Sequence, residues 1–175
     1  MNKEKIIKDF KKNIKNIFKD NYIFSFIGGS IAKNKITNKS DIDIFICIKS
    51  KRVQQQKIFI KWYLDFHKKN KLLPDKKFSG EITNINNLDK KLTLTLKTTP
   101  KLIISNKDVY DGLVWAGMLF GPNIAFIGNK KIYLERKKIA KKIISLWIKK
   151  ITNKPQQTKG DDLLKKIIKP TKSLL

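Results

Sequence analysis

The chain has few acidic residues, one cysteine, one histidine and no long apolar run, and each of these shortages excludes a class of structure or site. A single cysteine, Cys47, cannot form an internal disulfide framework and suits a reducing compartment. The only histidine, His67, has no second imidazole with which to form a metal site. No apolar run approaches the roughly 20 residues that span a bilayer, and residues 1–20 are charged throughout. We therefore expect no membrane segment, no secretory signal and a cytoplasmic location.

Lysine dominates the charge of the chain. Forty Lys plus Arg, nearly all of them lysine, stand against 14 Asp plus Glu, for a formal net charge of +26. A field this positive predicts a polyanionic partner, with RNA as the first candidate. A general bias of the composition toward Lys, Asn and Ile is the competing explanation, and both stay open. Lysine is a point charge, not the planar fork that binds phosphates bidentately.

Length and hydrophobic content limit the architecture. A chain of 175 residues with 41% hydrophobic residues can bury the core of one domain. We expect a core over residues 1–100, a helical part of the same unit over 101–151, and a flexible tail with a short amphipathic helix over 152–175. Nothing in the sequence indicates an oligomeric state.

Hydrophobic spacing predicts most of the helices. Apolar residues recur every three or four positions over residues 3–19, 53–69, 108–120 and 131–151. Asn106 is placed to cap the third of these helices. In the last helix, the predicted buried face carries Ile139, Ile143, Leu146 and Trp147. Short runs rich in β-formers predict strands at residues 22–27, 41–49, 76–84 and 124–127. Residues 86–97 fit a strand or a helix equally well.

A Gly-Gly-Ser turn and a pair of aspartates are the most informative features of the chain. Gly28, Gly29 and Ser30 follow a β-rich run, and Asp41 and Asp43 alternate with isoleucines ten residues later. Residues two apart in a strand point to the same face, so both carboxylates are expected side by side. Their repulsion favours a divalent cation, and oxygen ligands of this kind suit Mg²⁺. The glycines allow a phosphate to approach the backbone closely.

This arrangement resembles the active-site motif of the polymerase-beta-like nucleotidyltransferase superfamily. That motif joins an apolar residue, Gly and Gly or Ser, through a spacer of roughly ten residues, to Asp-apolar-Asp/Glu-apolar. Ile27 to Ser30 and Asp41 to Ile44 match it, and Ser40 fits the short connection into the metal-bearing strand. An ordinary surface turn followed by a half-exposed strand is the alternative reading. Strands are depleted in Asp, which argues against that alternative.

The resemblance implies a fold, a reaction and a set of site residues. The expected fold class is α/β (α+β), a small mixed sheet flanked by helices, with C-terminal helices packed alongside. The expected activity is transfer of a nucleoside monophosphate from an NTP to an acceptor, with Mg²⁺, or Mn²⁺ as the alternative. ATP is the default nucleotide. The expected nucleotide-binding residues are Gly28, Gly29, Ser30 and Ser40.

The superfamily also supplies a third carboxylate from a later strand. Glu81 is the candidate, because Gly80 before it allows close approach and Ile82 after it would point to the core. Asp75 and Asp89 are its rivals. Asp41, Asp43 and Glu81 are thus the expected metal ligands and catalytic residues.

Two other functions compete with this one. A nucleotidyltransferase-like module could hold RNA or a protein without catalysis, which the basic charge would favour and the intact aspartates disfavour. An enzyme acting on cationic antibiotics would need an acidic cleft, and 14 acidic residues make one difficult to form.

Overall fold

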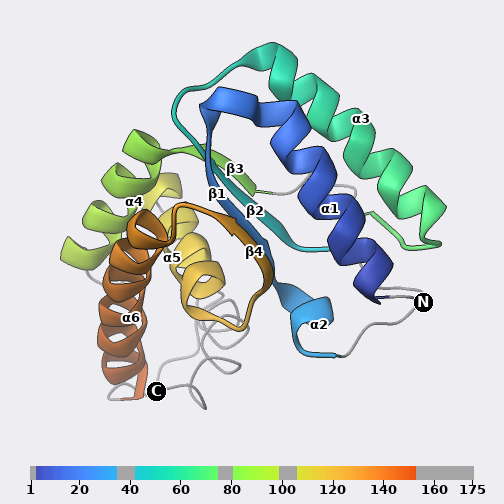
Figure 1. Cartoon of the computed structure of the whole chain (residues 1–175). Coiled ribbons are helices and arrows are strands. Elements are labelled where there is room, and N and C mark those ends of the chain that lie inside the picture. Colours follow the sequence, from blue (N-terminus) through green and yellow to red (C-terminus); the bar gives the residue numbers. More distant parts are fainter. Residues whose placement is uncertain (1–2, 35–41, 75–80, 99–105, 153–175) are drawn as a thin grey trace. The chain divides into compact units, whose positions relative to one another are not determined.

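The computed structural model describes residues 3–34, 42–74, 81–98 and 106–152, with Glu81 and residues 149–152 described by their backbone alone (Figure 1). These parts form an α+β fold with six α-helices, one 3₁₀-helix and one four-stranded mixed sheet, which confirms the predicted fold class. The elements are α1 (Lys3–Phe18), η1 (Lys19–Asn21), β1 (Tyr22–Ile27), α2 (Gly29–Ala32), β2 (Ile44–Ile48), α3 (Val53–Lys69), β3 (Glu81–Asn84), α4 (Ile85–Lys97), α5 (Lys107–Phe120), β4 (Ile124–Gly128) and α6 (Lys130–Thr152).

The sheet has the strand order β3-β2-β1-β4. Strand β1 is antiparallel to both β2 and β4, while β2 and β3 are parallel. The ladder between β1 and β2 ends at the pair Ile27–Ile44, and β3 begins opposite Phe45 with Glu81. The ends of β1, β2 and β3 that carry the candidate site residues therefore lie at one edge of the sheet.

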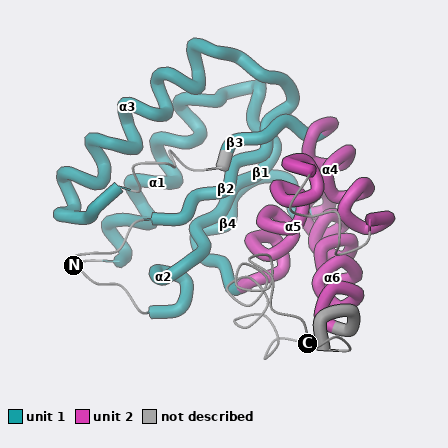
Figure 2. Tube along the Cα trace, turned by 180° about the vertical axis from the view of Figure 1, so that it is seen from behind, with its two compact units in different colours: residues 1–85, 122–130 teal, residues 86–121, 131–175 magenta. Residues whose placement is uncertain are grey.

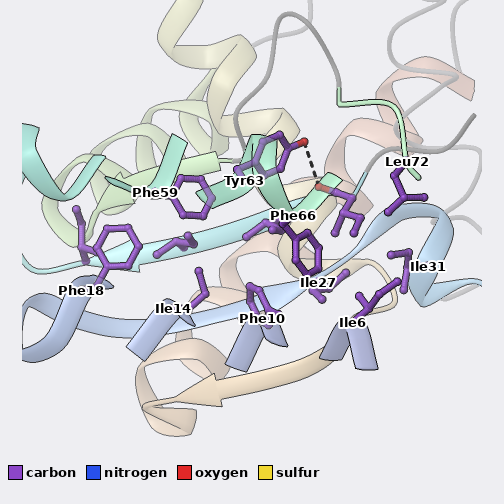
Figure 3. Close-up of a cluster of buried hydrophobic side chains, with 14 residues drawn as sticks. Ile6, Phe10, Ile14, Phe18, Ile27, Ile31, Phe59, Tyr63, Phe66 and Leu72 are labelled. Atoms are coloured by element: carbon purple, nitrogen blue, oxygen red, sulfur yellow. Dashed lines mark hydrogen bonds between the residues drawn. The ribbon is translucent and has the colours of Figure 1, made fainter. Parts of the chain in front are cut away.

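Helices α1 and α3 cover one face of the sheet with a single apolar cluster (Figures 1 and 3). The inward residues of β2, Ile44, Ile46 and Ile48, belong to this cluster together with Ile42, as their alternation predicts. The helices contribute Ile6, Phe10, Ile14 and Phe18 from α1 and Phe59, Tyr63 and Phe66 from α3. Through Ile42, the cluster therefore also holds the segment before β2.

The opposite face of the sheet carries stacked phenylalanines. The rings of Phe26 and Phe45 lie 5.3 Å apart with an interplanar angle of 6°, and Phe24 stacks on Phe45 at 6.0 Å. Cys47 lies on the same face as Phe45 and is fully buried, as free cysteines commonly are.

The chain divides into two compact units, shown in different colours in Figure 2. Unit 1 comprises residues 1–85 and 122–130, and unit 2 comprises residues 86–121 and 131–175. In unit 2, the Lys91 ammonium lies 2.5 Å from Asp111 and 3.3 Å from Asp108, so it joins α4 to α5. Arg136 of α6 donates two hydrogen bonds to the Asp89 carboxylate of α4.

The helical periodicity predicted α1, α3, α5 and α6 within one residue at nearly every end. Asn106 caps α5 as expected, since its Oδ1 accepts from the N–H groups of Asp108 and Val109. The ambiguous segment 86–97 is helical, because Leu88, Leu92 and Thr95 are buried at helical spacing. Leu146 was predicted to be buried, which is wrong: it is 40% exposed, and Ile144 is buried with Ile143 and Trp147.

Strand β2 is shorter than predicted. It begins at Ile44 rather than Asp41, because β1 ends at Ile27 and the chain turns away at Gly28 and Gly29 after one more bond, from the Gly28 N–H to the Asp43 carbonyl. Within the described residues, no helix is long and apolar enough to cross a lipid bilayer.

Candidate active site

The end of strand β1 turns sharply through two glycines into helix α2. Gly29 has φ +60°, a left-handed conformation that glycine adopts without steric cost. The Gly28 N–H donates to the Asp43 carbonyl at 2.8 Å, one step beyond the last pair of the ladder. This bond ties the glycine turn to the segment before β2, although 14 intervening residues separate them in the sequence.

The Asp43 carboxylate lies directly against Gly29. A Cβ atom built on Gly29 would overlap Oδ2 of Asp43 and lie 2.5 Å from its Cγ. The acid therefore occupies the space that any side chain at position 29 would need. Asp43 itself remains only partly buried.

Ser30 contributes an unsatisfied hydroxyl to the same turn. Among the described residues, its Oγ is the one buried side-chain polar atom without a hydrogen-bond partner. Such an atom costs free energy unless a ligand or water pairs with it. A Cβ added at Gly28 would meet nothing within 4 Å. These three features fit a bound metal–phosphate group: the unpaired hydroxyl of Ser30, the open space beside Gly28 and the Asp43 carboxylate against Gly29.

The register of the sheet brings the start of β3 close to Asp43. Glu81 pairs with Phe45 in parallel register, and Phe45 is two residues after Asp43, so the backbone at the start of β3 lies beside the segment that carries Asp43. Strand spacing and rise per residue place the Cα atoms of Asp43 and Glu81 roughly 8 Å apart. At that backbone separation, Glu81 stays the candidate for the third ligand.

Several predicted ligands cannot be placed. Ser40 and Asp41 lie outside the described residues, as does Asp75, one of the rivals to Glu81. The described parts of the chain contain no group of three acidic, histidine or cysteine side chains that could hold a metal. Because Asp41 and the Glu81 side chain are outside that search, the predicted ligand set stays a prediction.

The other rival, Asp89, already has a partner. It lies on α4, where its two oxygens accept hydrogen bonds from Arg136 at 3.0 and 2.7 Å. A carboxylate held by a bidentate arginine has less free charge to offer a cation. Asp89 is therefore a poorer candidate than Glu81 for the third ligand.

The buried His67 is a feature of the site region that sequence analysis did not find. Its ring contacts the main chain of Ile42, 25 residues earlier in the sequence. Helix periodicity placed His67 near the end of α3, but no local pattern connects it to the aspartate segment.

A family model described as polymerase beta, nucleotidyltransferase matches residues 12–109 of the chain. The match covers more than half of the sequence and contains the glycine turn, both aspartates and Glu81. The chain belongs to this nucleotidyltransferase family. Searches of characterised proteins and of solved structures gave no significant match. Family membership agrees with the resemblance inferred from Gly28, Gly29, Ser30, Asp41 and Asp43.

Proposed function

We propose that this polymerase-beta-type chain is a metal-dependent nucleotidyltransferase. It would transfer a nucleoside monophosphate from an NTP to an acceptor hydroxyl or phosphate and release pyrophosphate. The observation that carries the proposal is the contact of the Asp43 carboxylate with Gly29, beside the unpaired buried hydroxyl of Ser30. A surface turn that binds no ligand would explain neither the close contact of Asp43 with Gly29 nor the unpaired Ser30 hydroxyl.

Asp41, Asp43 and Glu81 would hold the metal, Mg²⁺ or Mn²⁺. When bound, the ion would neutralise triphosphate charge and lower the barrier to attack on the α-phosphorus. Gly29 and Ser30 would bind the β and γ phosphates, with Ser30 Oγ as a hydrogen-bond donor. Most of the rate enhancement would come from positioning the acceptor in line with the leaving pyrophosphate.

The reaction balances without a further co-reactant. The acceptor oxygen forms a bond to the α-phosphorus as the bond from that phosphorus to the bridging oxygen of pyrophosphate breaks. Glu81 would take the proton of an acceptor hydroxyl, and the electron pair of the broken bond would leave with pyrophosphate. Asp43 would remain a carboxylate throughout.

The charge of the chain favours an anionic acceptor, and RNA is the first choice. A net charge of +26 attracts polyanions and repels cationic small molecules. No residue in the motif reads a base edge, so the motif selects none of the four nucleotides. ATP is taken as the default donor.

Label transfer tests the proposal. Purified protein, Mg²⁺ and fractionated cell extract would receive α-labelled ATP, CTP, GTP or UTP in turn, and label would be followed into RNA, protein and small molecules. We expect label in one fraction from one preferred nucleotide. Absence of transfer from all four, together with salt-sensitive RNA binding, would favour the non-catalytic binding module.

A further inference from the structure

Two side chains of helix α3 hydrogen-bond to the main chain of Ile42, the residue between Asp41 and Asp43. The Ile42 N–H donates to His67 Nε2 at 3.1 Å, and the Tyr63 hydroxyl donates to the Ile42 carbonyl at 3.5 Å. The second bond is the dashed line in Figure 3. Both polar groups of Ile42 are therefore satisfied by side chains rather than by a neighbouring strand.

The partners of His67 determine its tautomer. Its Nδ1 lies 2.8 Å from the Tyr63 carbonyl, which can only accept, so Nδ1 carries a proton. The Ile42 N–H can only donate, so Nε2 carries none. The ring is thus neutral, it is fully buried, and it packs against the Tyr63 ring at 4.1 Å between centroids. An imidazole bonded at both nitrogens has one orientation and presents a fixed acceptor to Ile42.

The aspartate segment needs such an anchor because the sheet ends beside it. Strand β2 begins at Ile44, and beyond the ladder pair Ile27–Ile44 the Gly28 N–H donates one more bond to the Asp43 carbonyl. The Ile42 side chain is 1% exposed and lies in the core cluster. Core packing fixes the depth of Ile42, while the two hydrogen bonds fix the rotation of its main chain, which leads directly to Asp43.

We propose that His67 and Tyr63 are positioning residues that, through the main chain of Ile42, hold Asp43 in the geometry required for metal binding. This inference rests on the proposed function, because it assumes that the two aspartates hold a divalent cation. His67 provides most of the effect, since its bond is shorter than the long bond from Tyr63. Groups that orient metal ligands typically affect metal affinity by about 10–100-fold.

Four variants separate positioning from stability. His67→Leu leaves the Ile42 N–H without an acceptor, whereas His67→Gln keeps an acceptor oxygen at the same reach. Tyr63→Phe removes only the longer bond. Phe66→Leu, at the neighbouring buried position of α3, should lower stability while both hydrogen-bonding side chains to Ile42 stay in place. Thermal unfolding without metal and Mn²⁺ binding by electron paramagnetic resonance are measured on the full chain.

We expect His67→Leu to weaken Mn²⁺ binding by 10-fold or more, and His67→Gln and Tyr63→Phe by less than about 3-fold. Phe66→Leu should bind Mn²⁺ as the wild type does, despite a similar loss of melting temperature. Equal affinity in His67→Leu and wild type, or equal weakening in Phe66→Leu, would overturn the positioning role. If His67→Leu does not fold, His67→Asn, whose shorter side chain cannot reach Ile42, replaces it in the same comparison. A wild type that binds no Mn²⁺ would instead overturn the proposed function on which the inference depends.

Discussion

At the scale of single residues, the site depends on one contact between a glycine and an acid. Gly29 has a positive φ, and its Cα faces the Asp43 carboxylate so closely that no side chain fits between them. Two constraints, one from the backbone and one from space, therefore require glycine at this position. Gly28 carries neither constraint.

Gly29→Ala is expected to abolish transfer. The methyl group would push Asp43 out of place and strain the backbone by about 1–2 kcal/mol, and displacement of a reacting group by about 1 Å can cost about 100-fold in rate. We expect at least that loss in NTP turnover, together with a lower melting temperature.

Gly28→Ala is the matched control for stability. Its Cβ meets open space, and the Gly28 φ of −108° is accessible to alanine. We expect a melting temperature close to that of the wild type. A Gly29→Ala protein with wild-type turnover would contradict the role given to the contact between Gly29 and Asp43.

Sequence analysis identified the residues of the glycine turn and Asp43 because their chemistry is local. A tight turn favours glycine and a metal site favours carboxylates, so both can be recognised from residue types at short spacing in the sequence. The contact of His67 with Ile42 leaves none, because it depends on how α3 packs across β2. Tertiary contacts of this kind follow from the fold and not from the pattern of either segment.

At the scale of elements, α4 and α5 approach closely at Gly112. A Cβ on Gly112 would overlap Thr95 Oγ1 and lie 2.5 Å from the Lys91 carbonyl oxygen. The Thr95 hydroxyl also bonds to the carbonyls of Lys91 and Val109, so it has little freedom to move away. The crossing of these helices therefore requires glycine.

Gly112→Ala should destabilise unit 2. Replacing glycine by alanine in an exposed helix stabilises by about 1 kcal/mol, but overpacking at this crossing is expected to cost about 1–3 kcal/mol. Urea unfolding of the full chain measures the sign of the change in the free energy of unfolding. A more stable Gly112→Ala protein would show that α4 and α5 are farther apart than described.

The Lys91 ion pairs should give unit 2 a dependence on alkaline pH. Burial lowers the pKa of Lys91, but the hydrogen bonds and charges of Asp111 and Asp108 outweigh it, so the net pKa lies above the ordinary 10.5. A raised pKa in the folded state means that the stabilisation is complete below pH 10.5 and is lost as pH rises through the folded value.

The stability difference between wild type and Lys91→Met measures this effect. We expect about 1–3 kcal/mol near neutral pH, because loss of the ammonium leaves two carboxylates without their partner, and a decreasing difference above about pH 10.5. Lys90→Met, at a side chain that is 73% exposed and 4.0 Å from Asp108, should change stability by less than about 0.5 kcal/mol. A difference that stays constant up to pH 12 would contradict the assignment.

Periodicity predicted the long helices well, because each buries one apolar stripe over several turns. Periodicity failed where the apolar pattern is short, or where the structure of a segment depends on a neighbouring element. Residues 86–97 alternate like a strand but pack like a helix, and β2 is cut short by the turn of β1 away from it. Leu146 fits the apolar stripe of α6 by spacing alone, yet its neighbours leave it exposed.

At the scale of the whole molecule, charge is the dominant property. The net +26 is carried mostly by lysines, and the described structure pairs few of them with acids. Lysine without a planar fork attracts phosphates with little geometric preference. Such a surface should bind polyanions by charge and leave their selection to the active site.

RNA binding should therefore be strongly dependent on salt and independent of the aspartates. Release of counterions from about five phosphates would weaken binding of single-stranded RNA roughly 100-fold between 50 and 200 mM salt. Fluorescence anisotropy with a labelled oligonucleotide would measure this for the wild type and for Asp41→Ala/Asp43→Ala. Affinity that is insensitive to salt would show that the excess of lysine reflects composition alone.

The most direct test of the central claim is metal-dependent label transfer by the wild type and by the Asp41→Ala/Asp43→Ala double variant. With the preferred α-labelled NTP and acceptor, we expect the double variant to lose transfer entirely while circular dichroism shows an unchanged fold. Its melting temperature without metal should equal or exceed that of the wild type, since the repulsion between the two carboxylates is gone. Transfer by the double variant at the wild-type rate would contradict the account, because the chemistry would then not depend on these carboxylates.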